Sequence, residues 1–267
     1  MGNAFFVVWR ESLEAFLIAG ILYAWLQAND DTGPGKRALF GGLAAGVGLA
    51  LLLGWALLSV QDGLSGDALE IFQTVTLFVA AGLITQMVLW MKKNGRTIKS
   101  RLHADLSAAA ERSGYLGVAV VAALAVAREG AETVIFLYGL AQGGDLQAMF
   151  VGSLAGLAGA ALTAWVTARS LARLNIGLLL RLSSILLLIL ASALLIAGVE
   201  RMIGAGWLPT LIDPIWDSSF LLDDTSKIGK LLANLTGYRA RPTLSMLLVW
   251  LGYWGIVIAA HRRIARG

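Results

Sequence analysis

Two short charged motifs interrupt long apolar stretches of the chain. Residues 10–14 and 128–132 both have the form Arg-Glu-x-x-Glu. A charged side chain near the centre of a bilayer costs at least ~2.5–3.5 kcal/mol on insertion scales, so a membrane protein that keeps two such motifs uses them. The carboxylates outnumber the guanidinium groups in each motif, and the net negative charge suits a cation.

The spacing within each motif places its charges on one side of a helix. Residues three and four apart on a helix share a face, so the two glutamates of a motif project together and the arginine reaches the second one. Oxygen ligands alone suit a hard ion such as calcium, magnesium, manganese or ferric iron. The chain has no cysteine and only two histidines, which disfavours copper and zinc. The candidate metal ligands are Glu11, Glu14, Glu129 and Glu132, with Arg10 and Arg128 as orienting groups.

Two other interpretations of the motifs stay open. Each Arg–Glu pair could be a neutral ion pair that only holds helices together. That interpretation leaves Glu11 and Glu129 without an arginine four residues away, and an uncompensated buried charge is expensive. For the same reason these two glutamates are the expected direct ligands. The second alternative is a proton-coupled transporter or an exchanger of another cation, in which the same glutamates carry protons.

The composition is that of a membrane protein. Hydrophobic residues make up 58% of the 267-residue chain and charged residues 14%, well below the share in soluble domains. The 31 glycines fit, because small residues let membrane helices approach closely. The net charge of +4 is no sign of nucleic-acid binding here, since basic residues in a membrane protein mark the cytoplasmic side.

Apolar stretches predict an all-α membrane protein with seven transmembrane helices in a single polytopic domain, 1–267. A span needs about 20 apolar residues. The predicted spans are 4–27, 37–60, 70–91, 115–140, 147–168, 177–199 and 243–261.

Lys and Arg gather in the first, third and fifth loops and in the tail. The long sixth loop carries fewer for its length, and long loops have little influence on orientation. The N-terminus is therefore expected outside and the C-terminus in the cytoplasm. Several tryptophans fall near predicted span ends, as in an aromatic belt: Trp90, Trp207, Trp216 and Trp250.

The motifs lie in the first and fourth spans, which this orientation makes antiparallel. The chain is therefore expected to contain a 3+3 inverted repeat plus one additional helix. Transporters commonly use such repeats and bind substrate near the midplane, at the repeat interface. The expected parts are repeat one at about 4–91, repeat two at about 115–199, an outer loop at about 200–242 and a seventh helix at about 243–261.

Further polar residues lie at the expected outer side and are candidates for the mouth of an ion path. Glu70 and Gln73 begin the third span; as a helix-start acid, Glu70 also has a purely structural explanation. The acids of the outer loop could concentrate cations, although an ordinary solvated loop is the favoured explanation. These loop residues are Asp213, Asp217, Asp223 and Asp224.

The chain resembles the oxidase-dependent iron transporter family, which includes fungal high-affinity iron permeases and bacterial EfeU-type permeases. The family motif is Arg-Glu-Gly-x-Glu, and residues 128–132 match it fully, whereas Ser12 replaces the glycine in the first copy. Other matching segments are 70–72 (Glu-Ile-Phe), 90–93 (Trp-Met-Lys-Lys) and 237–238 (Gly-Tyr). Many relatives have a glutamate where this chain has Gln73, so a second acidic site there is not expected to carry full charge.

The resemblance implies an iron permease of the bacterial cytoplasmic membrane, not an enzyme. It implies that iron is the transported substrate, that no cofactor is permanently bound, and that ferric iron is delivered by a periplasmic or extracellular oxidising partner. Membrane lipid and a further copy of the chain are the other expected partners, and no nucleic acid is expected. A retinal photoreceptor is disfavoured, because the seventh span contains no lysine.

Overall fold

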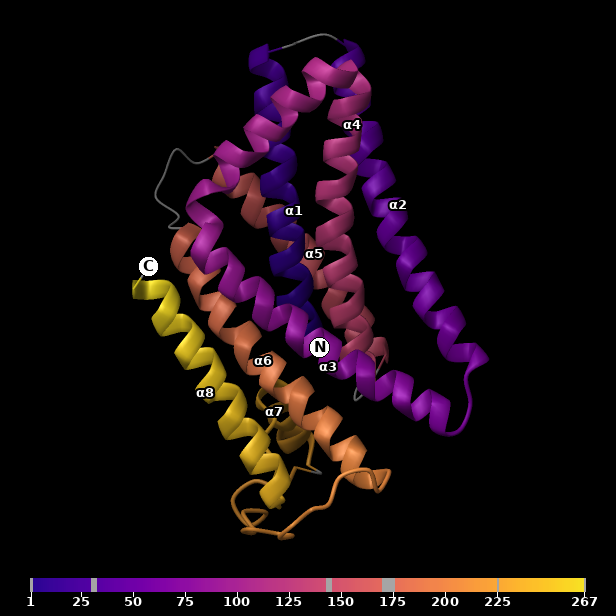
Figure 1. The fold of residues 1–267 in the computed structure, drawn as a ribbon, viewed down its shortest axis with the longest axis vertical. Helices are drawn as coiled ribbons and strands as arrows, with labels where there is room; N and C mark the ends of the chain where they lie inside the picture. Colours follow the sequence, from indigo (N-terminus) through magenta and orange to yellow (C-terminus); the bar gives the residue numbers. More distant parts are fainter. Residues whose placement is uncertain (1, 30–32, 143–145, 170–175, 225, 267) are drawn as a thin grey trace.

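Helices form almost all of the computed structural model, which describes residues 2–29, 33–142, 146–169, 176–224 and 226–266 (Figure 1). No strand occurs in these ranges. The α-helices are α1 (Gly2–Asn29), α2 (Gly33–Gly63), α3 (Asp67–Asn94), α4 (Ile98–Ala141), α5 (Leu146–Arg169), α6 (Ile176–Gly204), α7 (Lys227–Thr236) and α8 (Leu244–Arg266).

Five of these helices are long and apolar enough to cross a membrane: α2, α3, α5, the Arg181–Gly204 part of α6 and the Leu244–Ile264 part of α8. Each of the seven predicted spans lies within, or within one residue of, one of the long helices. The two long helices outside the group of five are α1 and α4, which carry the charged motifs. That α1 and α4 also cross the membrane stays a prediction.

The region between the third and fourth predicted spans is helical, which the apolar pattern did not predict. Residues 98–113 join the fourth span as one helix with a sharp kink at Gly114, where φ is 57° and ψ is −136°. Glycine adopts such a positive φ without the penalty that a Cβ brings. The turn is tight, because a Cβ on Gly117 would lie 2.2 Å from the carbonyl oxygen of Ala109. The first part of α4 therefore folds back over the end of α1 (Figure 1).

Helices α1 and α4 lie against each other and run in opposite directions. Glu11 is close to Glu129, and further along α1 Leu22 packs in one cluster with Val118 and Ala122 of α4. As residue numbers rise along α1, they therefore fall along the α4 residues that it contacts. The motifs thus meet in the interior of the bundle.

Small residues let α2 and α5 approach the two motif helices closely. A Cβ on Gly46 of α2 would lie 2.7 Å from the carbonyl oxygen of Ala123 in α4. A Cβ on Gly156 of α5 would lie 2.5 Å from the carbonyl oxygen of Phe5 in α1. Backbone contact of this kind is how membrane helices associate. Each motif helix therefore has a small-residue helix along its side.

Helix α3 packs against α6, and α6 in turn contacts α7 and α8. The largest buried apolar cluster combines Leu77 and Ile84 of α3 with Leu187 and Leu194 of α6. Helix α7 begins at Ser226, whose hydroxyl accepts a hydrogen bond from the Gly229 N–H, and ends at Gly237 in the left-handed conformation. This short helix lies in the predicted outer loop and was not predicted.

The two chain ends lie beside different helices. The Asn3 side chain donates to the carbonyl of Asn234, which places the start of α1 beside α7. His261, near the end of α8, is hydrogen-bonded to Lys92 at the far end of α3. The placement of the termini on opposite sides of a membrane, and which of them is cytoplasmic, stays a prediction.

Candidate ion site between helices α1 and α4

Three carboxylates from the two motifs meet in the interior of the bundle. One oxygen each of Glu11, Glu14 and Glu129 lies within 4.8 Å of the other two, a spacing that could hold a metal ion. The helical spacing accounts for the pair from α1, because Glu11 and Glu14 are three residues apart. Glu132, one turn further along α4, is outside this group. The structure therefore brings together three of the four predicted ligands, and their role as ligands stays a prediction.

The glycine in the second motif lets another helix come close. A Cβ on Gly130 would lie 2.5 Å from the Cβ of Ala50 in α2. The neighbouring Glu129 is buried and lies beside the glutamates of α1. Ser12 occupies the matching position in α1 and is half-buried. The glycine of the family motif is thus used for helix contact in α4.

Arg10 pairs with both glutamates of its motif. Its Nη1 lies 3.0 Å from an oxygen of Glu11, and its Nη2 lies 2.9 Å from an oxygen of Glu14. The expectation that Glu11 has no arginine partner is therefore wrong, because the guanidinium group folds back along its own helix and spans both carboxylates. The Arg10 side chain is 0% exposed. The sulfur atoms of Met87 and Met91 in α3 complete its surroundings.

Arg128 is held differently from Arg10. Its Nε lies 3.1 Å from Glu132 but 4.0 Å from Glu129, and 48% of its side chain is exposed. Its guanidinium carbon lies over the ring of Trp90 in α3, 4.7 Å from the ring centre. The two motifs are alike in sequence, yet their charges are compensated unequally.

The site therefore combines buried carboxylates with incomplete neutralisation. The second oxygen of Glu11 and one oxygen of Glu132 are buried and have no hydrogen-bond partner among the described residues. Buried carboxylate oxygens without partners are costly unless a cation or a proton reaches them. A ligand set made of carboxylates favours a hard cation.

Helix α3 supplies three contacts that the sequence interpretation missed. Met87, Trp90 and Met91 touch the arginines of the two motifs. Their spacing places them on one face of α3. That pattern predicts a packed helix face, and only the position of α3 across both motifs gives these side chains a role beside the charges. Trp90 had been interpreted as part of an aromatic belt.

The residues proposed for an outer mouth lie away from this cluster. Glu70 is exposed in the first turn of α3, and Gln73 accepts a hydrogen bond from Arg201. In the same region the hydroxyl of Tyr138 donates to Gln61. These contacts tie the ends of α2, α3, α4 and α6 together and make a polar layer at that end of the bundle.

The loop acids have structural partners. Asp217 lies 2.9 Å from Arg241, and its pKa is held below the usual value mainly because the Ser219 hydroxyl and N–H donate to it. Asp224 accepts a hydrogen bond from the Ala240 N–H. Asp213 and Asp223 are exposed. These contacts favour the solvated-loop explanation over a cation funnel.

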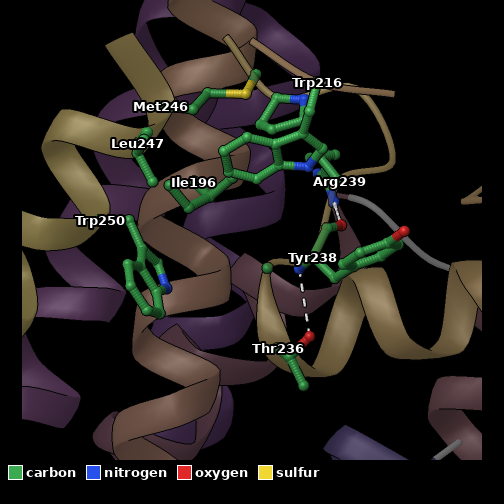
Figure 2. A pocket seen from close by; sticks show the side chains of 10 residues that line it. Ile196, Trp216, Thr236, Tyr238, Arg239, Met246, Leu247 and Trp250 are labelled. Atoms are coloured by element: carbon green, nitrogen blue, oxygen red, sulfur yellow. Dashed lines mark hydrogen bonds between the residues drawn. The ribbon is translucent and has the colours of Figure 1, made fainter. Parts of the chain in front are cut away.

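Two hollows lie elsewhere in the bundle. One has a volume of about 350 Å³ between α6, α7 and α8, and Figure 2 shows Trp216, Tyr238 and Trp250 around it. None of the described residues that line it is acidic, and none of them belongs to the two motifs. The other has a volume of about 440 Å³ and follows α1 beyond Glu14, with Leu17 and Ile21 on one side and His103 of α4 on another.

Comparisons with known proteins find relatives over nearly the whole chain. The Iron permease FTR1 family matches residues 1–263. A ferrous iron permease EfeU of Escherichia coli and one of Shigella sonnei are each 28% identical over 251 residues, covering 93% of this chain and 91% of theirs. A ferrous iron permease EfeU of Yersinia pestis is 27% identical, covering 93% of this chain and 89% of its own.

No solved structure matches the chain. The family match nevertheless extends over both motifs and every long helix. It confirms the resemblance inferred from the motifs and indicates a membrane transporter rather than an enzyme. The chain belongs to the iron permease FTR1 family.

Proposed function

We propose that this protein carries iron inward across a bacterial cytoplasmic membrane through the site between α1 and α4. The observation that supports this most strongly is the meeting of Glu11, Glu14 and Glu129 within 4.8 Å, from two motifs far apart in the chain. Arg10 and Arg128 lower the net charge of the site without cancelling it. Partial neutralisation lets the site hold a cation and still release it.

The donor set supports ferric iron as the ion held by the carboxylates. Carboxylates are hard ligands, and the site offers no sulfur or histidine ligand in its carboxylate cluster. The relatives named above are described as ferrous iron permeases. Both points fit a scheme in which ferrous iron reaches the outer face, a partner protein there removes one electron, and ferric iron occupies the carboxylates.

The helix contacts support an inverted repeat, α1–α3 related to α4–α6, with α8 added. Helix α2 lies beside α4, α5 lies beside α1, and α3 lies beside α6, which is the pairing that a two-fold relation requires. Both second helices present Gly-x-x-x-Gly-x-x-x-Ala, at residues 42–50 and 152–160. The site then sits on the two-fold axis between repeats, as in other transporters.

The route away from the site follows the inner half of α1. Leu17 and Ile21 of α1 line the 440 Å³ hollow, which begins about one turn beyond Glu14. Residues of α5 and His103 of α4 form its other walls. With the N-terminus outside, this hollow opens at the cytoplasmic end. Ions would thus pass from the polar outer layer, through the carboxylates, into the inner hollow.

Iron uptake into proteoliposomes tests this proposal. Ferrous and ferric iron are supplied separately to liposomes that contain the purified protein, and to protein-free liposomes as a blank. The Glu129→Gln variant should lose most uptake of either form, because it keeps the shape of the side chain and removes its charge. Glu111→Gln, which changes an exposed glutamate outside the motifs, should keep it.

Two results would contradict the proposal. One is the absence of iron uptake by the wild-type protein; the other is normal uptake by Glu129→Gln. Proton movement that depends on Glu129 without iron movement would instead support the alternative of a proton-coupled transporter of another cation.

A further inference from the structure

The two motif arginines differ in how firmly their positions are fixed. Arg10 is fully buried, lies within 3.0 Å of both of its glutamates, and is enclosed by Met87 and Met91. Arg128 is half exposed and approaches only Glu132 closely. Arg10 is therefore a fixed charge, whereas Arg128 has room to move.

The guanidinium group of Arg128 packs over an aromatic ring. The guanidinium carbon of Arg128 lies 4.7 Å from the ring centre of Trp90, within the range of a cation–π interaction. Tryptophan has the most favourable ring for this contact. Trp90 belongs to α3, which carries neither motif, so the contact joins a third helix to the ion site.

The ring and Glu129 compete for the same guanidinium group. In the position seen, Arg128 Nε lies 3.1 Å from Glu132 but 4.0 Å from Glu129. In the other motif, the corresponding arginine touches both glutamates. Glu129 is thus the ligand of the three-carboxylate cluster whose arginine stands furthest away.

We infer that Trp90 is a positioning residue of the ion site, which holds Arg128 away from Glu129 and so leaves the charge of Glu129 to the transported cation. The inference rests on the proposed function. Without the ring, Arg128 forms an ion pair with Glu129 as well as with Glu132, just as Arg10 pairs with both of its glutamates. The guanidinium group then competes with the ion for the Glu129 carboxylate. Trp90 thus affects the affinity of the site for the ion without touching the ion itself.

Equilibrium binding on purified protein in nanodiscs tests this role. The probe is radioactive ferric iron, or ferrous iron kept anaerobic if only that form is taken up by the wild-type protein. Trp90→Leu keeps an apolar side chain and removes the ring, and should raise the Kd about threefold to thirtyfold. Trp90→Phe keeps a weaker ring and should lie between wild type and Trp90→Leu.

A positioning role also predicts how transport changes. In proteoliposomes, Trp90→Leu should raise the KM for iron while the maximal rate is not lowered, because release from a weaker site is no slower. A variant that merely loosens the fold would instead lower the maximal rate. Thermal unfolding of each variant shows whether the fold is intact. If Trp90→Leu is not stable, the same Kd and KM measurements are made on Trp90→Phe.

Two comparisons give the test its controls. At the end of α5, the guanidinium carbon of Arg169 lies 4.8 Å from the ring centre of Trp165, away from the ion site. Trp165→Leu removes that ring and should leave the Kd for iron unchanged. In an Arg128→Gln background, Trp90→Leu should have no further effect on the Kd, because the group on which Trp90 acts is gone.

The possible outcomes separate this inference from the proposed function. An unchanged or lower Kd in Trp90→Leu overturns the inference, and so does an equal loss of affinity in the Arg128→Gln background. A wild-type protein that takes up iron in neither form contradicts the proposed function itself.

Discussion

Arg10 and Arg128 occupy the same position of the same motif, yet their surroundings predict that substitution lowers stability by different amounts. Arg10→Gln leaves two buried carboxylates without their cation and should lower the free energy of unfolding by about 3–5 kcal/mol. Arg128→Gln removes a half-exposed partner and should cost only about 0–1 kcal/mol. Thermal unfolding of both variants in the same detergent measures the difference, and equal losses would show that the two arginines are equivalent.

At this residue scale, the sequence predicted which side chains carry the chemistry but not how each is held. The spacing of the motifs was sufficient to place Glu11 and Glu14 on one face. The spacing also predicted the Arg10–Glu14 pair, but not that Arg10 pairs with Glu11 as well. The methionines beside Arg10 and the ring beside Arg128 were not predictable, because they depend on where α3 crosses the motifs. Contacts between distant segments leave no periodic signal in the sequence.

At the scale of helices, the prediction concerns the contact between α2 and α4. A Cβ on Gly46 would lie 2.7 Å from a backbone oxygen of α4, whereas Gly48 on the same helix has nothing within 4 Å. Gly46→Val should push the helices apart, lower stability by about 1–3 kcal/mol and reduce iron uptake. Gly48→Val is the matched control and should leave both unchanged. Similar behaviour of the two variants would mean that this close contact is not needed.

The helices that the sequence missed are those without a long apolar stretch. The region 98–113 is rich in charged residues and alanine, and its helix is recognisable only from the way Leu102 and Leu106 pack on α1. Helix α7 has Ile228, Leu231 and Leu232 on one face, a helical spacing within what was interpreted as a loop. The repeated Gly-x-x-x-Gly-x-x-x-Ala was readable in the sequence and would have strengthened the case for a repeat.

At the scale of the whole molecule, the positions of the loops predict how the protein sits in the membrane. The turn between α2 and α3 lies at the same end as the polar layer of Gln61, Tyr138 and Arg201. The first part of α4 lies at the other end, where basic residues gather. The charge pattern predicts that the first end lies outside and the second in the cytoplasm.

Cysteine labelling tests this orientation without background, because the chain has no cysteine of its own. Ser65→Cys and Ser100→Cys place single thiols at exposed positions of the two ends. In intact cells an impermeant thiol reagent should label Ser65→Cys and spare Ser100→Cys, and permeabilised cells should give labelling of both. If Ser100→Cys alone is labelled in intact cells, the protein is inserted the other way, and the inner hollow beside His103 becomes the outer mouth of the path.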